Sequence, residues 1–180
     1  KALRILPRVQ NRGKNKNILL RAILNFFAIS SPDEWDALYG TMPAAYRQSM
    51  PDQCDPYATA TWLRLGEREA EKSTTAKYDP KAFLDALQAI RLLTTEPPEV
   101  FEPRIRIMCA ESGVVFALVH EIPRSRVSGA ARWLNNRPLI QLSLYGKKND
   151  RFWFTFFHEA GHILKHSHQL VFLDDRTQGA

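Results

Sequence analysis

The sequence lacks the features of a membrane or secreted protein. No run of apolar residues approaches the ~20 that cross a bilayer, and the first residues do not form a signal peptide. Cysteine is scarce, since Cys54 and Cys109 are the only two and neither stands in a CxxC or CxxH spacing. A disulfide framework is therefore not expected, and the sequence predicts a protein of the reducing cytoplasm with no membrane contact.

Acidic residues are absent from the first 32 positions. This stretch holds seven basic residues, which are Lys1, Arg4, Arg8, Arg12, Lys14, Lys16 and Arg21. The other 18 of the 25 basic residues are balanced by 19 acidic ones, so the net charge of +6 comes from the N-terminal stretch. Such a segment can contact nucleic acid through the phosphates. The alternative is a solvated linker, because "QNRGKNKN" has too few apolar residues to pack.

The sequence pattern changes along the chain from helical to strand-like. With 180 residues, 44% of them apolar, the chain fits one globular domain with a helical extension. The predicted helices are residues 18–29, 31–40, 42–49, 55–73, 80–94, 101–113 and 151–167, and the predicted strands are residues 114–122, 127–134 and 138–146. The fold class is therefore α+β. We expect a helical region at residues 1–75, followed at residues 76–180 by a domain whose small sheet packs on the last helix.

Several apolar side chains of the helical region are predicted to lie in a core. The segment at residues 18–29 is apolar on nearly all sides, which is typical of a buried helix. In the helix at 55–73, the residues expected to face the core are Tyr57, Ala60, Leu63 and Leu65. Trp35 and Trp62 are more simply explained as core residues than as ligand contacts.

The segment "FFHEAGHILKH" carries three of the five histidines. Within it His158, Glu159 and His162 form H-E-x-x-H on a predicted helix. Histidines four residues apart lie on one helix face, so both imidazoles can reach one zinc ion at ~2.1 Å. Glu159 projects beside them, where its carboxylate can hold and deprotonate a zinc-bound water. We therefore predict a zincin-type site, in which His158 and His162 bind zinc and Glu159 is the catalytic base.

The apolar surroundings of the motif favour a metal site. The motif arises by chance in roughly 1% of chains of this length, and polar groups in an apolar helix are costly without a partner. We expect Phe154 and Phe157 to exclude bulk water from the site. We also expect Gly161 to allow close approach of the sheet, because a glycine inside a helix costs about 1 kcal/mol relative to alanine. The alternative is that backbone or carboxylate contacts satisfy the histidines.

A zincin site needs a third protein ligand, and the motif alone does not supply it. His166 lies ~12 Å along the axis from the first histidine of the motif and cannot reach the ion while the helix continues. His168 has the metzincin spacing, but Lys165 stands where that pattern has the glycine that turns the chain. Asp174 and Asp175 reach the ion only if the intervening segment folds over the helix.

One predicted strand has a pattern that suits substrate binding. In residues 138–146, Leu139, Gln141 and Ser143 alternate with apolar neighbours, which is typical of a half-buried strand. An exposed strand edge next to a metal offers backbone donors and acceptors to a peptide of any sequence. We therefore expect a substrate peptide to bind as an added strand beside Leu139, Gln141 and Ser143. The alternative is a central strand with no free edge.

The segment "VSGAARWLNNRPLIQLSLYGKKNDRFWFTFFHEAGHILKH" resembles the ImmA/IrrE family of cytoplasmic metallopeptidases. In particular it resembles the branch fused behind an XRE-type helix-turn-helix domain, which includes antitoxins and transcriptional regulators. Weaker similarity extends through "YRQS", "ATATWLRLGEREAEK" and "KAFLDALQAIRLLTTEPPEVF", so the resemblance covers most of the chain. The H-E-x-G-H helix, preceded by an aromatic-rich run, is its most specific part.

The resemblance implies a zincin-like fold, zinc held by His158 and His162, Glu159 as the catalytic base, and a regulatory protein such as a repressor as the substrate. It also implies a DNA-binding helix-turn-helix domain before Lys1 and an acidic third ligand beyond Ala180, so this segment alone is expected to be inactive. The alternative function is a non-proteolytic sensor module of a helix-turn-helix regulator or antitoxin. The intact glutamate favours the peptidase, since a pure sensor has no need of it.

Overall fold

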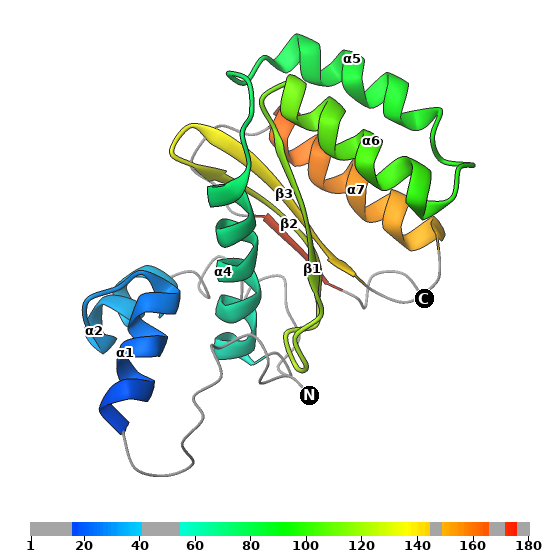
Figure 1. The fold of residues 1–180 in the computed structure, drawn as a ribbon. Helices are drawn as coiled ribbons and strands as arrows, with labels where there is room; N and C mark the ends of the chain where they lie inside the picture. The colour runs from blue at the N-terminus through cyan, green and yellow to red at the C-terminus, as the bar shows by residue number, and fades with distance from the viewer. Residues whose placement is uncertain (1–15, 41–54, 145–148, 166–171, 176–180) are drawn as a thin grey trace.

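The structure is a computed structural model that describes residues 16–40, 55–144, 149–165 and 172–175 (Figure 1). Its helices are α1 (Lys16–Phe27), α2 (Pro32–Trp35) with the π-helical η2 (Asp36–Gly40), α4 (Pro56–Lys72), α5 (Pro80–Arg91), α6 (Pro98–Glu111) and α7 (Asn149–Lys165). Its strands are β1 (Val115–His120), β2 (Val127–Leu134), β3 (Arg137–Leu144) and β4 (Phe172–Asp175). The fold class is α+β, as predicted. The helix predicted at residues 42–49 lies outside the described residues.

Three helices begin with the same local signal, a side-chain oxygen at the N-cap followed by proline. Ser31, Asp55 and Asp79 each accept a hydrogen bond from a backbone N–H of the first turn, at 3.2, 2.9 and 2.8 Å. The proline that follows has no N–H that would need a partner there. At the other end of a helix, α6 stops before Gly113, whose φ of 85° suits glycine. The caps predicted at Ser31 and Gly113 are confirmed.

The strand order in the sheet is β1-β3-β2-β4, so β3 is a central strand. It runs parallel to β1 and antiparallel to β2, and β2 pairs with β4 on its other side. The β2–β3 hairpin turns through Asn135 and Asn136, whose φ angles are 50° and 64°. Both angles lie in the left-handed region that asparagine tolerates and that two-residue hairpin turns require. The turn predicted at "NNR" is confirmed, and it sets the register of β2 against β3.

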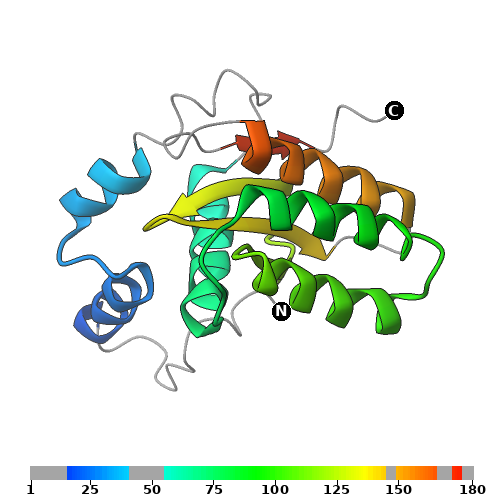
Figure 2. The same cartoon turned by 90° about the horizontal axis from the view of Figure 1, so that it is seen from above.

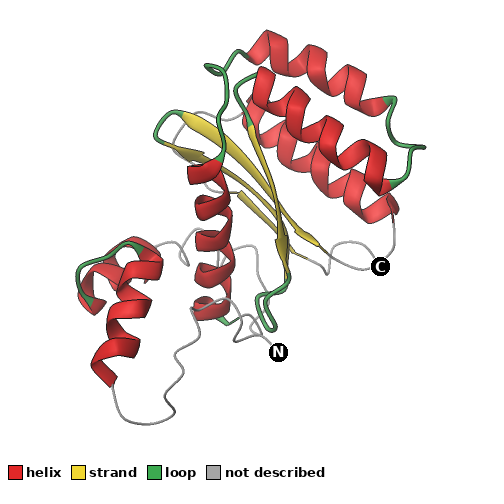
Figure 3. Cartoon of the chain, in the orientation of Figure 1, coloured by secondary structure: helices red, strands yellow, loops and turns green. Residues whose placement is uncertain are grey.

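Helices cover both faces of the sheet. Figures 1 and 3 show α4 on one face and the group α5, α6 and α7 on the other, and Figure 2 shows the same layers from above. α7 packs on β2 and β3, α6 packs on β1, and α4 packs on β1 and β3. As a result, residues 138–143 of β3 are buried on both faces. The half-buried pattern predicted for this strand is wrong, because its two faces meet two different helical layers.

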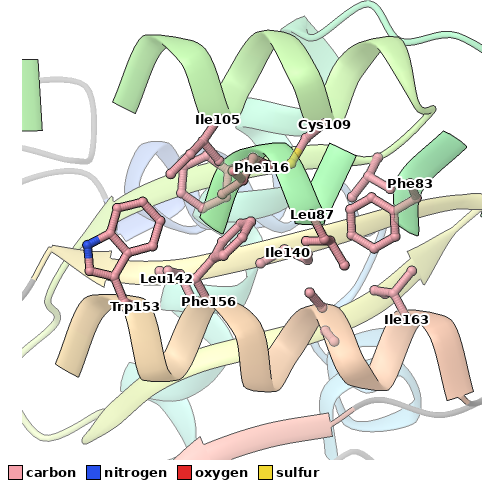
Figure 4. Packing of buried hydrophobic residues seen from close by; sticks show 14 of the residues in the cluster. Phe83, Leu87, Ile105, Cys109, Phe116, Ile140, Leu142, Trp153, Phe156 and Ile163 are labelled. Atoms are coloured by element: carbon pink, nitrogen blue, oxygen red, sulfur yellow. The ribbon is translucent and has the colours of Figure 1, made fainter. Parts of the chain in front are cut away.

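The larger core lies between the sheet and the helices α5 to α7 (Figure 4). Trp153, Phe156 and Ile163 of α7 pack toward Ile140 and Leu142 of β3. The other labelled members of this core, from α5, α6 and β1, are Phe83, Leu87, Ile105, Cys109 and Phe116. Fully burying a side chain of this size contributes ~1.5–3 kcal/mol relative to leaving it exposed, so this cluster is the main support of α7.

On the α4 face, the sheet is held by buried polar side chains. Arg132 of β2 is 2% exposed, and it donates to the Glu67 carboxylate at 2.8 Å and to the backbone oxygen of Leu63 at 2.7 Å. Glu67 also accepts from Arg64 at 2.9 Å. Burial lowers the pKa of Arg132, and the neighbouring Glu67 carboxylate opposes that effect. Removing one member of a buried pair leaves the other charge uncompensated, so these contacts specify how α4 sits on the sheet.

Gly66 allows α4 to approach β3 closely. Gln141 of β3 donates to the backbone oxygen of Trp62 at 2.6 Å and accepts from Arg132 at 3.3 Å. A Cβ added at Gly66 would lie 1.8 Å from Oε1 of Gln141. A residue with a side chain at position 66 would therefore displace either the helix or the hydrogen-bonded amide.

The described part of the helical region expected at residues 1–75 includes a helix that packs on the sheet. α4 lies within it by sequence, yet it packs on the sheet and contributes Trp62 and Leu63 to a core shared with β1 and β2. The burial predicted for Trp62, Leu63 and Ala60 is confirmed. Tyr57 is 66% exposed, so its predicted place in the core is wrong. Its ring stacks instead on Trp35 at the surface, with ring centroids 4.9 Å apart.

α1 differs from the buried helix that its sequence predicts. Ile18, Leu19 and Leu20 are 52%, 43% and 44% exposed. The helix is anchored at its other end, where Phe26 is buried and its backbone oxygen accepts from Nε of Arg64 at 2.7 Å. Among the described residues, α1 therefore packs by its C-terminal turn, and its apolar first turns stay exposed.

The helices and the cysteines of the described residues can be compared with the sequence, which predicts neither a membrane span nor a disulfide framework. In the part of the chain that the structure describes, none of the helices has the length and apolar character needed to cross a membrane. Cys109 is a buried free thiol, and burial raises its pKa to about 12. Cys54 lies outside the described residues. Cys109 is thus a core residue rather than a nucleophile.

We expect Gly66→Ala to destabilise the protein, because the added methyl group overlaps the buried amide of Gln141. The expected loss in the free energy of unfolding is ~1–3 kcal/mol, measured by chemical denaturation. Gly161→Ala in α7 is the matched control, since no atom lies within 4 Å of a Cβ at that position. It should stabilise the helix by about 0.5–1 kcal/mol. Equal effects of the two changes would show that α4 tolerates a side chain against β3.

Candidate metal centre on helix α7

The sides of α7 differ in their surroundings. Phe156, Ala160 and Ile163 face the sheet and are buried. His158 lies on the outward side and is exposed, and His162, one turn later, is half-buried. A period of 3.6 residues per turn produces this division. The helix that supports the core therefore also presents a histidine pair at the surface.

The two imidazoles of the pair lie close together. Nε2 of His158 is 3.0 Å from Nε2 of His162, and the ring centroids are 4.6 Å apart. Two nitrogens bound to one tetrahedral zinc ion at ~2.1 Å are ~3.4 Å apart. The observed separation is near that value, and imidazole nitrogen is a donor that zinc favours. The two predicted ligands therefore fit a shared metal ion with only a small movement of the rings.

The carboxylate of Glu159 lies on another side of the helix, against β2. Glu159 is 0% exposed. A Cβ added at Gly129 of β2 would lie 2.8 Å from Oε1 of Glu159 and 2.5 Å from Cγ2 of Thr155. The missing side chain at position 129 thus leaves the space that the carboxylate occupies. In this buried setting bulk water is excluded, and electrostatic interactions of the carboxylate are strengthened.

The glycine that allows helix and sheet to approach is Gly129, and the role expected for Gly161 is wrong. A Cβ at Gly161 would meet no atom within 4 Å. Gly161 lies three residues after His158, on the outward part of the helix, whereas the sheet contacts the side that holds Glu159 and Phe156. The sequence does contain a signal for Gly129, since an isolated glycine in a strand pattern marks a close approach of another element.

The described residues do not group a third candidate ligand with the histidine pair. In that part of the chain, no three histidine, cysteine, aspartate or glutamate side chains are grouped so that they could hold a metal ion. His166 and His168 lie outside the described residues, as do the side chains of Asp174 and Asp175. The backbone of β4 returns the chain to the sheet beside β2. The predictions for the third ligand therefore stay predictions.

The structure contradicts the expected substrate strand. β3 pairs with β1 on one side and β2 on the other from Leu139 to Leu142, so a peptide finds no free edge there. Leu139 and Gln141 are fully buried toward α4, and Ser143 donates from Oγ to the backbone oxygen of Val127 at 2.6 Å. The polar residues of this strand therefore bind other parts of the protein, which is why the alternation misled the prediction.

The sequence did not predict the groove that lies beside His158. It has a volume of about 630 Å³ and is open to solvent. It is lined by Arg91, the last residue of α5, by Thr94 just beyond that helix, and by Trp153, Phe154, Phe157 and His158 of α7. Phe154, expected to exclude water, is instead 66% exposed. Phe154 lies four residues before His158, and this spacing places both side chains on the same side of the helix. The spacing is the sequence signal that could have predicted an exposed ring beside the histidine.

Comparison with known proteins adds no family to these observations. No protein-family model matches the chain, and neither the curated proteins nor the solved structures contain a match. The resemblance to the ImmA/IrrE family therefore stays a hypothesis, which depends on the segment quoted above and on its H-E-x-x-H motif.

Proposed function

We propose that the protein is a zinc-dependent endopeptidase with a zincin-like fold, and that it cleaves a regulatory protein such as a transcriptional repressor. The observation that supports this best is the pair of Nε2 atoms 3.0 Å apart, on a helix where the residue after the first histidine is a buried glutamate. Burying a carboxylate is costly. A buried glutamate next to two histidines that can bind a metal is most simply explained by a catalytic role.

The proposed reaction assigns a task to each residue of the motif. His158 and His162 would hold the zinc ion, which when bound supplies a Lewis acid that polarises the scissile carbonyl. Glu159 takes a proton from the attacking water as the water oxygen bonds to the carbonyl carbon. It then gives that proton to the leaving amine as the C–N bond breaks, so one water is consumed and the carboxylate is regenerated. The low dielectric around Glu159 strengthens its hold on the water.

The choice of substrate class rests on the ImmA/IrrE resemblance. That resemblance implies a cytoplasmic enzyme whose protein substrate is a repressor or other regulator. It also implies an upstream helix-turn-helix domain that contacts DNA and an acidic third zinc ligand beyond Ala180. His158, His162 and Glu159 are among the described residues, and the remaining parts of the proposal come from the sequence.

A second candidate function is a non-proteolytic sensor module of a helix-turn-helix regulator or antitoxin. Two observations favour it. Glu159 is closed off from solvent, and the described residues supply two metal donors rather than three. In this function the same fold would respond to a ligand or partner without hydrolysing it, so cleavage assays with and without a chelator distinguish the two candidates.

Zinc in the purified full-length protein should depend on both histidines of the pair. We expect His158→Ala and His162→Ala to lose most of the bound zinc, because removing a direct ligand weakens binding by more than the ~10–100-fold typical of an outer-shell partner. Elemental analysis of the purified proteins measures it. His120→Ala is the matched control, since His120 is an exposed histidine at the end of β1.

Equal zinc in the wild type and the three histidine variants would exclude the pair as ligands.

Titration of residues 1–180 alone by calorimetry should show only weak zinc binding, because one of three ligands is expected to lie outside this segment. Tight one-to-one binding that His168→Ala abolishes would instead place the third ligand within the chain.

Glu159→Gln should abolish cleavage and retain zinc. The amide has nearly the shape of the carboxylate, so it fits the space at Gly129, but it cannot take a proton from water. We expect a loss of at least ~100-fold in cleavage rate. The full-length protein is incubated with candidate repressors, with and without chelator, and products are identified by mass spectrometry. Loss of zinc in the variant would show that Glu159 is a ligand, and a zinc-loaded wild type that cleaves nothing would favour the sensor.

A further inference from the structure

The groove beside His158 is formed where the end of α5 meets α7. Figure 2 shows these two helices side by side, and contacts join them. One wall comes from Arg91 and Thr94, and the other comes from the side of α7 that carries His158. Its volume of about 630 Å³ lies within the ~300–1,000 Å³ typical of ligand pockets. The groove therefore reaches His158, one member of the histidine pair, and has room for a few side chains.

The α7 wall of the groove is a preformed aromatic surface. Phe154 stacks on His158 with ring centroids 5.9 Å apart and an interplanar angle of 18°. Beside them, Trp153 stacks on Phe157 with centroids 6.0 Å apart. Trp153 is 7% exposed and anchored in the core, whereas Phe154 is 66% exposed. A large aromatic ring that is exposed in a hollow, and fixed by its neighbours, is suited to cover an apolar side chain of a partner.

The opposite wall carries a positive charge. Arg91 is exposed and forms no ion pair with any residue that the structure describes. Thr94, the other residue of this wall, is uncharged, and its hydroxyl donates to the backbone oxygen of Arg91 at 3.0 Å. Asp150, an exposed acid in the first turn of α7, does not line the groove. The groove therefore combines the aromatic wall of α7 with one positively charged side chain on the opposite wall. Such a surface complements a partner that has an apolar group next to a negative charge.

We propose that this groove is a specificity subsite, which binds an apolar side chain of the substrate polypeptide with an acidic residue next to it. The proposal rests on the peptidase function proposed above, since it places the bound segment beside the zinc ligands. The apolar side chain lies on Phe154 and Phe157, and the acidic side chain pairs with Arg91. Cleavage sites in the target protein are then selected by their acidic and apolar sequence, independently of any pairing with the sheet.

The test uses the full-length, zinc-loaded protein and two matched fluorescent peptides. Both peptides contain one leucine. In the first peptide an aspartate stands on each side of the leucine, and in the second peptide a lysine stands on each side. Cleavage is measured with the wild type, and binding is measured by fluorescence anisotropy with the non-cleaving Glu159→Gln protein. We expect the aspartate peptide to be preferred in both assays. In the Glu159→Gln protein, the further change Arg91→Glu should alter the relative affinity for the two peptides. We expect the ratio of their dissociation constants to shift by about tenfold in favour of the lysine peptide.

Two further variants separate the groove from general charge effects. Phe154→Ala should weaken binding of both peptides several-fold, and its exposed side chain makes loss of the fold unexpected. Arg151→Glu makes the same charge change at an exposed residue of α7 that does not line the groove, and it should leave the ratio unchanged.

The outcomes distinguish this inference from the proposed function. Charge-dependent binding that follows Arg91, without cleavage by the wild type, would support the groove and contradict the peptidase. Cleavage of both peptides at equal rates, unaffected by Arg91→Glu, would support the peptidase and overturn the groove. Failure of both peptides to bind the Glu159→Gln protein, or an equal response to Arg91→Glu and Arg151→Glu, would also overturn it.

Discussion

The approach of α7 to β2 at Gly129 determines what each side of the helix can do. Because position 129 has no side chain, Glu159 and Thr155 fill the space above the strand. The helical period then directs Phe156 into the core and leaves His158 facing outward. A side chain at position 129 would lift the helix or expel the carboxylate. Core packing and the candidate metal chemistry therefore depend on the same contact.

β2 is held from its other face by the polar contacts of α4. Residues alternate across a strand, so Gly129 faces α7 while Arg132 faces α4. Arg132 reaches Glu67 and the α4 backbone, and Gln141 fills the gap over Gly66. Each of these buried polar groups needs its particular partner, so a shifted helix would leave charges unpaired. The network on one face thus fixes the strand on which α7 rests.

This layered arrangement limits where a substrate can bind. Both faces of the sheet are covered, and β3 is paired on both edges, so the expected strand addition at residues 139–142 is excluded. The outward side of α7 is accessible, and the groove between it and the end of α5 leads to His158. Recognition by side chains in this groove would make an enzyme selective for sequence, whereas strand addition depends mainly on backbone. Selectivity of that kind would suit the proposed cleavage of a regulatory protein.

Local sequence signals determined much of this protein. Caps at Ser31 and Gly113, the Asn135–Asn136 turn and the H-E-x-x-H spacing were all readable, because each depends on residues a few positions apart. Tertiary structure alone decided which faces were covered. Because α4 covers the second face of the sheet, both faces of β3 are buried despite its alternating sequence. The first turns of α1 are exposed although their sequence is apolar. The glycine that allows α7 to approach the sheet closely is Gly129 rather than Gly161. Burial depends on partners far away in the sequence, and no local pattern contains them.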